Sequence, residues 1–365
     1  MKIAFFLPSL AGGGAEKMII NLLQGLKGYP CELELIVASA EGVWFSVLPE
    51  DIHCVDLKTG RVIRTIPALT KYLKESRPDI LFSGIDHANI VAIIAGKLSK
   101  TGVKNIISIQ RMSTEIRKVH QNRREKIVDW LKPFIYSKAD HIVCVSDGIC
   151  KEMTQTYHLP KEKLQRIYNP IIFEKDVNKE IDTRSKKTGE KKNIVAAGRL
   201  EEVKDYSTLI SAINIVHKSL DCQLIIYGEG PQREVLEEKI SKFGLEDTVL
   251  LPGFAIDLQT KLQLADLFVV SSITEGFGNV IVEAMAAGVP VVSTDCPCGP
   301  REILADGKYG ALVPVGDEKA VAEAIIHALQ QEVDQTVLIS RSKEFTIEKI
   351  SKKYFNLFLN IMGEG

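Results

Sequence analysis

Short, almost wholly apolar runs alternate with amphipathic segments along the whole of this 365-residue chain. Runs with so few polar side chains are typical of parallel strands that are covered by helices on both faces. Between the first two runs, apolar residues recur at helical spacing in Glu16–Lys27, so a helix is expected there. The repeated order of strand and helix predicts a doubly wound α/β fold. The expected strands are Lys2–Leu7, Glu34–Ala38, Ile80–Ser83, Asn105–Ile109, His141–Val145, Asn193–Ala197, Gln223–Tyr227, Thr248–Leu251, Leu267–Val270 and Val289–Ser293.

A charged segment, Glu174–Lys192, interrupts this alternation. It is nearly free of large apolar residues and cannot build a core, so it predicts a linker between two domains. Residues 1–173 and 193–346 are each long enough for one domain. We expect the two α/β halves to face each other across a cleft, where ligands usually bind. The sequence leaves open whether the last helix, about Ile347–Ile361, packs back on the first domain.

Composition and charge exclude several classes of protein. A net charge of −1 does not suit a general polyanion binder, so no nucleic-acid partner is expected. The seven cysteines include no CxxC pair near a histidine cluster, which indicates neither a disulfide framework nor a zinc site. The opening MKIAFFLPSL is interpreted as a strand rather than a signal peptide, and no apolar stretch reaches the ~18–20 residues that span a bilayer. We therefore expect a cytoplasmic protein that is at most peripheral on a membrane.

The most informative segment is Ser271–Pro290, which reads SSITEGFGNVIVEAMAAGVP and follows an expected strand. Its glycine-rich turn leads into a helix that is expected to begin near Gly278 and end at Gly288. The first N–H groups of such a helix lie at the carboxyl end of a strand and attract anions, which suits a diphosphate. The residues expected to present this backbone are Gly276, Phe277, Gly278 and Asn279.

Two carboxylates bracket this turn, Glu275 in the loop and Glu283 in the helix. Carboxylates accept hydrogen bonds from hydroxyl groups. Glu283 is therefore a candidate for binding a ribose, and Glu275 for binding the hydroxyls of a transferred sugar. Taken singly, Glu275 is better interpreted as a loop charge near a helix N-terminus, and Glu283 as a solvated helix residue. Their joint occurrence around a strand, a GxG turn and a helix favours the binding roles.

Basic and glycine-rich turns follow other expected strands. Arg199 and Lys204 come after the strand that follows the linker and are able to clamp two phosphates. The alternative is a solvated basic pair offset by neighbouring glutamates. Gly13 and Gly14 lie in GGGAE after the first strand, where a phosphate-binding turn and a plain turn are both consistent, because GGGAE is not GxGxxG. The later turn Gly228–Pro231 is interpreted as a plain turn that connects two elements and has no role in a site.

Residues 101–140 carry nine Lys or Arg against four acids, many of them on one expected helix. An apolar stripe on that helix consists of Ile116, Val119, Ile127, Trp130 and Leu131. A basic amphipathic helix suits an anionic membrane surface or a phosphorylated lipid acceptor. The alternative is a helix packed into the core with a solvated basic face. The candidate basic residues of this surface are Arg111, Arg117, Lys118, Arg123 and Arg124.

The order of four motifs resembles that of family-four retaining glycosyltransferases: GGGAE, GRLEEVK, EGFGNVIVEAMAAGVPVV and REILADGKYGALVPVGD. The likeness covers nearly the whole chain and is greatest to bacterial enzymes that build lipid-linked oligosaccharides, O-antigens and capsules. It implies the GT-B fold, with two Rossmann-like domains, and catalysis that needs no metal or other cofactor. The implied donor is a UDP-linked hexose or N-acetylhexosamine, with N-acetylgalactosamine or N-acetylglucosamine preferred. The implied acceptor is a glycan, either polyprenyl-diphosphate-linked or part of a surface polysaccharide.

The resemblance also implies a role for each candidate residue. Arg199 and Lys204 would hold the diphosphate, Glu283 the ribose and Glu275 the donor sugar. Gly13 and Gly14 would border the diphosphate and the acceptor, and front-face attack would retain the configuration of the sugar. The sequence departs from the family pattern at one place: where many relatives carry a histidine after the fourth strand of the first domain, it has Gln110 and Arg111. Arg111 is therefore the candidate contact to the donor sugar or to an acceptor phosphate.

Three other functions remain to be distinguished from transfer. The first is a catalytically silent protein of the same fold that binds a nucleotide or glycan. The second is an NAD-dependent oxidoreductase, which the missing dinucleotide fingerprint disfavours. The third is a sugar-nucleotide epimerase, which would act without any acceptor.

Overall fold

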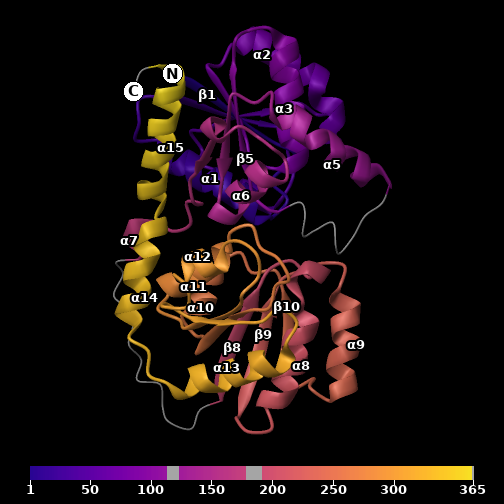
Figure 1. Cartoon of the computed structure of the whole chain (residues 1–365), viewed down its shortest axis with the longest axis vertical. Helices are drawn as coiled ribbons and strands as arrows, with labels where there is room; N and C mark the ends of the chain where they lie inside the picture. The colour runs from indigo at the N-terminus through magenta and orange to yellow at the C-terminus, as the bar shows by residue number, and fades with distance from the viewer. Residues whose placement is uncertain (113–122, 178–190, 364–365) are drawn as a thin grey trace. The chain divides into compact units, whose positions relative to one another are not determined.

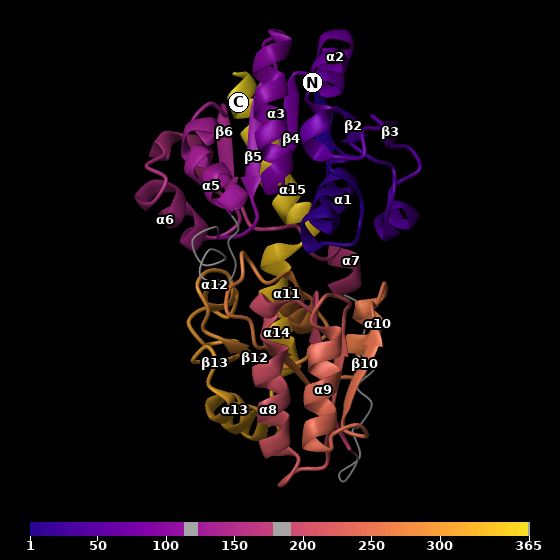
Figure 2. The same cartoon turned by 90° about the vertical axis from the view of Figure 1, so that its right-hand side faces the viewer.

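The computed structural model describes residues 1–112, 123–177 and 191–363, and the chain forms two compact units (Figure 1). Unit 1 comprises Met1–Ile171 and Phe345–Gly365, and unit 2 comprises Ile172–Glu344. In each unit helices flank a parallel sheet, as Figures 1 and 2 show from two sides. The prediction of two Rossmann-like α/β domains is confirmed.

Unit 1 contains, among its described residues, a seven-stranded parallel sheet of order β3-β2-β1-β4-β5-β6-β7. The strands are β1 (Lys2–Leu7), β2 (Glu32–Val37), β3 (His53–Asp56), β4 (Ile80–Ser83), β5 (Lys104–Ile109), β6 (His141–Cys144) and β7 (Leu164–Arg166). The helices are α1 (Gly14–Leu26), α2 (Ile66–Ser76), α3 (Asp86–Ser99), α5 (Arg123–Tyr136), α6 (Asp147–Gln155) and α15 (Ile347–Met362), with the 3₁₀ turns η1 (Val43–Val47), η2 (Val62–Thr65) and η3 (Lys161–Lys163). The strand order reverses between β1 and β4, and ligands of doubly wound sheets bind at such a point.

The C-terminal helix α15 packs against α1 of unit 1, although most of the chain lies between them (Figure 1). Tyr354 and Phe358 of α15 are fully buried, and their ring centroids lie 5.7 and 6.0 Å from that of Phe82 in β4. A Cβ atom at Gly25 of α1 would lie 2.1 Å from the Ser351 hydroxyl, so glycine permits this close approach of the two helices. The last helix therefore completes the core of the first unit, a point that the sequence leaves open.

Unit 2 contains, in the part of it that is described, a six-stranded parallel sheet of order β10-β9-β8-β11-β12-β13. The strands are β8 (Lys192–Ala197), β9 (Cys222–Tyr227), β10 (Val249–Gly253), β11 (Leu267–Val270), β12 (Val291–Thr294) and β13 (Ala311–Val313). The helices are α7 (Glu174–Val177), α8 (Tyr206–Val216), α9 (Arg233–Phe243), α10 (Leu258–Leu262), α11 (Asn279–Ala286), α12 (Pro300–Ile303), α13 (Glu318–Gln330) and α14 (Gln335–Ser342), with the 3₁₀ turns η4 (Glu202–Lys204) and η5 (Lys343–Phe345). Here the order reverses between β8 and β11, so the loops that follow these two strands lie at one edge.

All ten expected strands are present, three of them with the expected bounds and the others displaced by at most two residues at either end. Three short strands, β3, β7 and β13, were not expected. Each lies at the edge of its sheet and has only three or four residues. Edge strands are covered less completely than central ones, so they lack the continuous apolar run that identified the others.

Much of the expected linker, residues 178–190, lies outside the described part of the chain. Its first residues, Glu174–Val177, form the short helix α7 rather than an extended segment. Val177 is buried and belongs to a small apolar cluster of unit 2 with Ile172 and Ala286. Although the segment is mostly charged, its first residues therefore make one apolar contact with unit 2.

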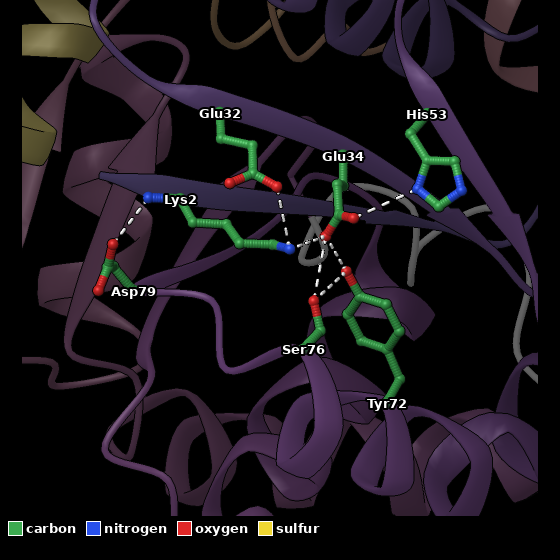
Figure 3. Close-up of polar contacts among 7 residues, drawn as sticks. All are labelled: Lys2, Glu32, Glu34, His53, Tyr72, Ser76 and Asp79. Atoms are coloured by element: carbon green, nitrogen blue, oxygen red, sulfur yellow. Dashed lines mark hydrogen bonds and ion pairs between the residues drawn. The ribbon is translucent and has the colours of Figure 1, made fainter.

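A buried carboxylate, Glu34, joins the amino ends of three strands of unit 1 (Figure 3). It accepts hydrogen bonds from Lys2 Nζ at 3.0 Å, from Ser76 Oγ at 3.2 Å and from the Tyr72 hydroxyl, and His53 Nδ1 lies 3.2 Å away. Burial alone raises the pKa of the Glu34 carboxyl, but the hydrogen bonds from Tyr72, Lys2 and His53 outweigh burial and lower it. The cluster lies at the sheet edge opposite to the carboxyl ends of the strands.

The low pKa of Glu34 predicts an acid-sensitive contribution to folding. A carboxyl whose pKa is lowered by folding stabilises the protein above its unfolded-state pKa, here near the ordinary 4.5, and loses that contribution as pH falls through the folded-state value. Glu34→Gln should therefore lower the melting temperature at pH 7 and make it fall less than in the wild type as the pH drops from 7 to below the folded-state pKa of Glu34. Exposed Glu50→Gln serves as the matched control. Parallel melting curves for wild type and Glu34→Gln across this range would contradict the prediction.

Candidate functional site

The turn between β11 and α11 has the conformation expected of an anion-binding helix start. Gly278 precedes the helix with φ 100°, and Gly288 follows it with φ 71°, both values that favour glycine. Gly299 packs on the turn so closely that a Cβ there would lie 1.8 Å from the Phe277 carbonyl oxygen. Within the described chain, no side-chain hydrogen bond caps the N-terminus of α11. The helix start is thus held by backbone packing at the carboxyl end of β11.

An ion pair lies at this turn. Lys204 Nζ is 2.5 Å from Glu275 Oε1, and the Ser272 hydroxyl donates to the same oxygen at 2.6 Å. The Glu275 side chain is only 10% exposed and that of Lys204 22% exposed. Lys204 is therefore not part of a solvated pair, and Glu275 is a loop charge before α11, as the alternative had it, but a largely buried one.

The loops that carry these two residues are bonded to each other. The N–H of Ile273 donates to the Val203 carbonyl at 2.8 Å, and the Ser271 hydroxyl donates to the Lys204 carbonyl at 2.8 Å. Because β8 and β11 are neighbours in the sheet, the loops at their carboxyl ends meet. The pairing of Lys204 with Glu275 therefore follows from the sheet order, which the sequence does not reveal.

Glu283 and Arg199 have different surroundings. Glu283 is 6% exposed, so the alternative of a solvated helix residue is wrong. The Arg199 side chain is 69% exposed, and its Nε lies 3.2 Å from Glu201 Oε1. A neighbouring glutamate therefore neutralises the charge of Arg199, as the alternative expected, whereas Lys204 pairs with the distant Glu275.

Two glycines outside the motif hold the Arg199 turn in place. A Cβ at Gly228 would lie 1.9 Å from the Gly198 carbonyl oxygen, and one at Gly230 would lie 2.5 Å from the Leu200 carbonyl oxygen. The N–H of Leu200 donates to the Glu229 carbonyl at 2.9 Å. The turn Gly228–Pro231 is therefore more than a connection between elements, since it packs directly on the turn that carries Arg199. In the sequence, only its two glycines indicated such close packing.

Two ionisable groups near Glu275 were not singled out from the sequence. Tyr206 is buried, and burial together with the negative charge of Glu275 raises its pKa well above the ordinary value. Burial and the same charge raise the pKa of the Cys296 thiol to about 12. Both groups are therefore neutral near pH 7, so they add no charge near the ion pair.

In unit 1, the glycine-rich turn leads directly into α1. Gly13 is the residue before the helix and Gly14 is its first residue, at the carboxyl end of β1. The carbonyl of Gly13 accepts a hydrogen bond from the buried Trp44 indole at 3.2 Å. The turn thus lies beside the reversal between β1 and β4, although a phosphate role for it stays a prediction.

The polar residues after β5 lie at the same edge of unit 1. Gln110 Nε2 donates to the Ser108 hydroxyl at 2.8 Å, and Gln110 Oε1 accepts from Asn169 Nδ2 at 3.0 Å. Arg111 is more exposed, and its Nε lies 3.9 Å from the carboxylate of Asp86. The role of Arg111 in substrate binding stays a prediction.

The basic helix corresponds in part to α5. Arg117 and Lys118 lie outside the described residues, and the side chains of Arg123 and Arg124 are likewise not described. Farther along α5, Trp130 is 79% and Phe134 67% exposed, whereas Lys132 is buried and lies 3.1 Å from Asp86. The apolar stripe is therefore not packed into the core at Trp130. Among residues 1–112, 123–177 and 191–363, no helix is long and apolar enough to cross a membrane.

Two family models match the chain in succession. The model described as Glycosyltransferase Family 4 matches residues 12–175, and the one described as Glycosyl transferases group 1 matches residues 177–345. Together they account for most of the chain, and the two matches meet near the start of the expected linker.

Curated relatives align over nearly the full length. The N-acetylgalactosamine-N,N'-diacetylbacillosaminyl-diphospho-undecaprenol 4-alpha-N-acetylgalactosaminyltransferase of Campylobacter jejuni is 28% identical over 341 residues, which is 91% of each chain. A second alpha-1,4-N-acetyl-D-galactosaminyltransferase of that organism is 26% identical over 99% of each chain. The lipopolysaccharide core biosynthesis glycosyltransferase LpsE of Rhizobium meliloti is 25% identical over 93% of each chain.

Solved structures share the fold at lower identity. HepE of Anabaena, in complex with UDP-glucose, superposes with a TM-score of 0.79 at 21% identity, over 99% of this chain and 100% of that one. A sucrose-phosphate synthase from Thermosynechococcus elongatus superposes with a TM-score of 0.80 at 17% identity, over 100% of both chains. With its two successive family matches, its full-length relatives and its paired Rossmann-like units, the chain belongs to the family-four glycosyltransferases of the GT-B fold.

Proposed function

We propose that the protein is a retaining, metal-independent glycosyltransferase that moves a hexose or N-acetylhexosamine from a UDP-linked donor to a glycan acceptor. The observation that carries this proposal is the ion pair of Lys204 and Glu275 beside the start of α11. It combines a cation, a hydroxyl-binding carboxylate and helix N–H groups at one sheet edge. A nucleoside diphosphate that leaves from a sugar needs this combination.

Each part of the site has a distinct task in this proposal. Lys204 offsets the negative charge that develops on the leaving diphosphate, and the backbone around Gly278 binds the same phosphates. Glu275 accepts hydrogen bonds from hydroxyls of the donor sugar, and Glu283 accepts them from the ribose. Arg199 is exposed and its side chain pairs with the neighbouring Glu201, so it is able to turn toward an incoming phosphate.

The donor sugar and the acceptor are proposed from the relatives. Two of them are named N-acetylgalactosaminyltransferases that act on diphospho-undecaprenol or PP-undecaprenol compounds. Their names support N-acetylgalactosamine as the donor sugar and a polyprenyl-diphosphate-linked acceptor. We further propose N-acetylglucosamine as the other candidate sugar and the cytoplasmic face of a membrane as the place of transfer. The HepE complex supports UDP as the nucleotide. Retention by front-face attack and independence of metal rest on the family resemblance.

Transfer is tested with a panel of UDP-sugars and lipid-diphosphate acceptors, with mass spectrometry of the products. We expect a product one sugar heavier than the acceptor, an unchanged rate in EDTA and an α-linkage from an α-linked donor by NMR. UDP bound without transfer or hydrolysis of any UDP-sugar would instead support the silent binder. An epimerised UDP-sugar formed without acceptor would support the epimerase.

UDP binding to unit 2 should be visible as thermal stabilisation. A ligand at 100 times its Kd contributes about 2.7 kcal/mol to the folded state, so millimolar UDP should raise the melting temperature by several degrees. Arg199→Ala should remove most of this shift, because the second phosphate loses its guanidinium partner. Exposed Arg64→Ala in unit 1 is the matched control and should keep the shift. Without any shift in the wild type, the donor-site proposal is wrong.

Membrane binding through α5 is part of the proposed function. Trp130 and Phe134 lie four residues apart on an exposed helix face, and aromatic side chains favour the membrane interface. The same helix carries Arg123, Arg124 and Lys126 in its sequence, and basic residues attract anionic lipids. These observations support an anionic bilayer as the partner of this face.

The double variant Trp130→Ser/Phe134→Ser should bind vesicles of phosphatidylglycerol at least about tenfold more weakly than the wild type. Burying one aromatic side chain contributes roughly 1.5–3 kcal/mol, so even partial insertion of two rings exceeds that factor. Cosedimentation measures the partition. Val235→Ser/Val337→Ser, which alters two exposed apolar residues of unit 2, is the control. Equal binding by both double variants would remove α5 from the membrane proposal.

A further inference from the structure

Gln110 stands at the carboxyl end of β5, one strand from the reversal between β1 and β4 in unit 1. Its side chain is half-buried, whereas the residues that hold it, Ser108 and Asn169, are buried. Ligands of doubly wound sheets bind outside the carboxyl ends of the strands near such a reversal. Gln110 is therefore a neutral, partly accessible amide at the edge where a ligand is expected.

The orientation of this amide is fixed by its two partners. Gln110 Nε2 donates one hydrogen to the Ser108 hydroxyl at 2.8 Å, and Gln110 Oε1 accepts from Asn169 Nδ2 at 3.0 Å. A glutamine amide has two N–H hydrogens on its nitrogen, and this network uses one of them. Within the described part of the chain, the second N–H remains for a further acceptor. The Ser108 and Asn169 anchors hold it in one direction before any ligand arrives.

The anchors themselves are rigid. Ser108 lies within β5, where its carbonyl also accepts a hydrogen bond from Asn89 Nδ2 at 2.9 Å. Asn169 lies next to Pro170, whose carbonyl accepts from Asn21 Nδ2 of α1 at 2.9 Å. Gln110 is thus connected on one side to the central sheet and on the other to the segment that follows β7. A pre-oriented amide of this kind loses little conformational entropy when it binds.

We propose that Gln110 binds a hydroxyl group of a sugar substrate through its second amide N–H, and that Ser108 and Asn169 act as positioning residues for this contact. The inference rests on the proposed function, because it requires a sugar as the substrate. A neutral amide suits a sugar hydroxyl, which both donates and accepts hydrogen bonds. Arg111 is more exposed and its guanidinium lies near Asp86. A neutral sugar hydroxyl does not require the positive charge that Arg111 would supply.

Gln110→Glu separates a substrate contact from a structural role. The carboxylate has nearly the shape of the amide and can accept from both Asn169 and the rotated Ser108 hydroxyl, so the fold should be kept. It has no N–H to offer a ligand. We expect a kcat/KM for transfer about ten- to a hundredfold lower, with an unchanged melting temperature and an unchanged shift by UDP. A purely structural Gln110 would tolerate this change.

Gln110→Leu and Asn169→Ala complete the test. Leucine should lower kcat/KM at least about tenfold, and loss of the Asn169 anchor should lower it by a smaller factor of about three. Hydrolysis of the UDP-sugar without acceptor shows which sugar Gln110 binds. If Gln110 binds the donor sugar, hydrolysis falls together with transfer. If Gln110 binds the acceptor sugar, hydrolysis is unchanged while transfer falls. If Gln110→Leu fails to fold, Gln110→Glu alone decides. Transfer within twofold of wild type in Gln110→Glu would overturn the inference, whereas a wild type with no UDP shift would overturn the proposed function instead.

Discussion

Replacing Lys204 by alanine should lower kcat/KM for sugar transfer by about a hundred- to a thousandfold. The ammonium lies 2.5 Å from the carboxylate of Glu275, in the loop that leads into α11. Removing one electrostatic stabiliser of a developing anion typically costs a factor of about 10²–10³. The variant also leaves the carboxylate of Glu275 buried without its positively charged partner, which is costly for the folded protein. Steady-state kinetics over a range of UDP-sugar concentrations measure the loss.

The partner variant Glu275→Gln should behave differently. It keeps the positive charge of Lys204, so UDP should still raise the melting temperature, while transfer falls by about a hundredfold because the sugar hydroxyls lose a charged acceptor. In Lys204→Ala both UDP binding and transfer should fall. Exposed Lys218→Ala, at the far end of α8, is the matched control and should leave both unchanged. Full activity in Lys204→Ala would exclude this ion pair from the chemistry.

The central strands could be predicted closely because burial on both faces leaves a continuous apolar run. Leu267–Val270 shows this, since all four of its residues are buried and its bounds match the expectation. At β3 the signal fails, because none of its residues is fully buried and the alternation of apolar and polar residues is too short to recognise. The edge strand β10 was nevertheless expected, because its first three residues are apolar, so a strand is missed when an edge position is combined with the lack of an apolar run.

The individual residues of the candidate site could be predicted from the sequence, but the ion pair between Lys204 and Glu275 could not. Lys204 and Glu275 were both singled out, yet 71 positions separate them, and only the order of β8 beside β11 brings them together. Several strand orders are compatible with one sequence of alternating strands and helices. Arg199 shows the opposite case, because its short-range ion pair with Glu201 could be anticipated from the adjacent charges.

The position of α15 illustrates a third limit. Its amphipathic pattern identifies a helix with one buried face, but such a pattern does not reveal which domain covers that face. The buried face carries Tyr354 and Phe358, and their partners include Phe82, more than 270 positions earlier in the chain. The contact is aromatic and specific in geometry, with interplanar angles of 83° and 69° to the Phe82 ring.

Phe358→Ala should therefore destabilise unit 1, although residue 358 follows unit 2 in the chain. The side chain is fully buried in the core of unit 1, and truncation of a buried phenylalanine typically costs about 3–5 kcal/mol. Limited proteolysis with mass spectrometry should show new cleavage within Met1–Ile171, while fragments of Ile172–Glu344 stay protected. Exposed Asn356→Ala on the same helix is the control and should leave the cleavage pattern unchanged.

The matched variant for unit 2 is Phe268→Ala in β11, which removes an equally buried ring from the strand that precedes the Glu275 turn. It should open Ile172–Glu344 to cleavage and abolish the thermal shift by UDP, because the loops of β8 and β11 then lose their fixed spacing. Phe358→Ala should keep the stabilisation of unit 2 by UDP, since Lys204 and the start of α11 are untouched. If Phe358→Ala exposed unit 2 rather than unit 1 to protease, α15 would not stabilise the unit in whose core it lies, and the last helix would have to be assigned to the other half of the chain.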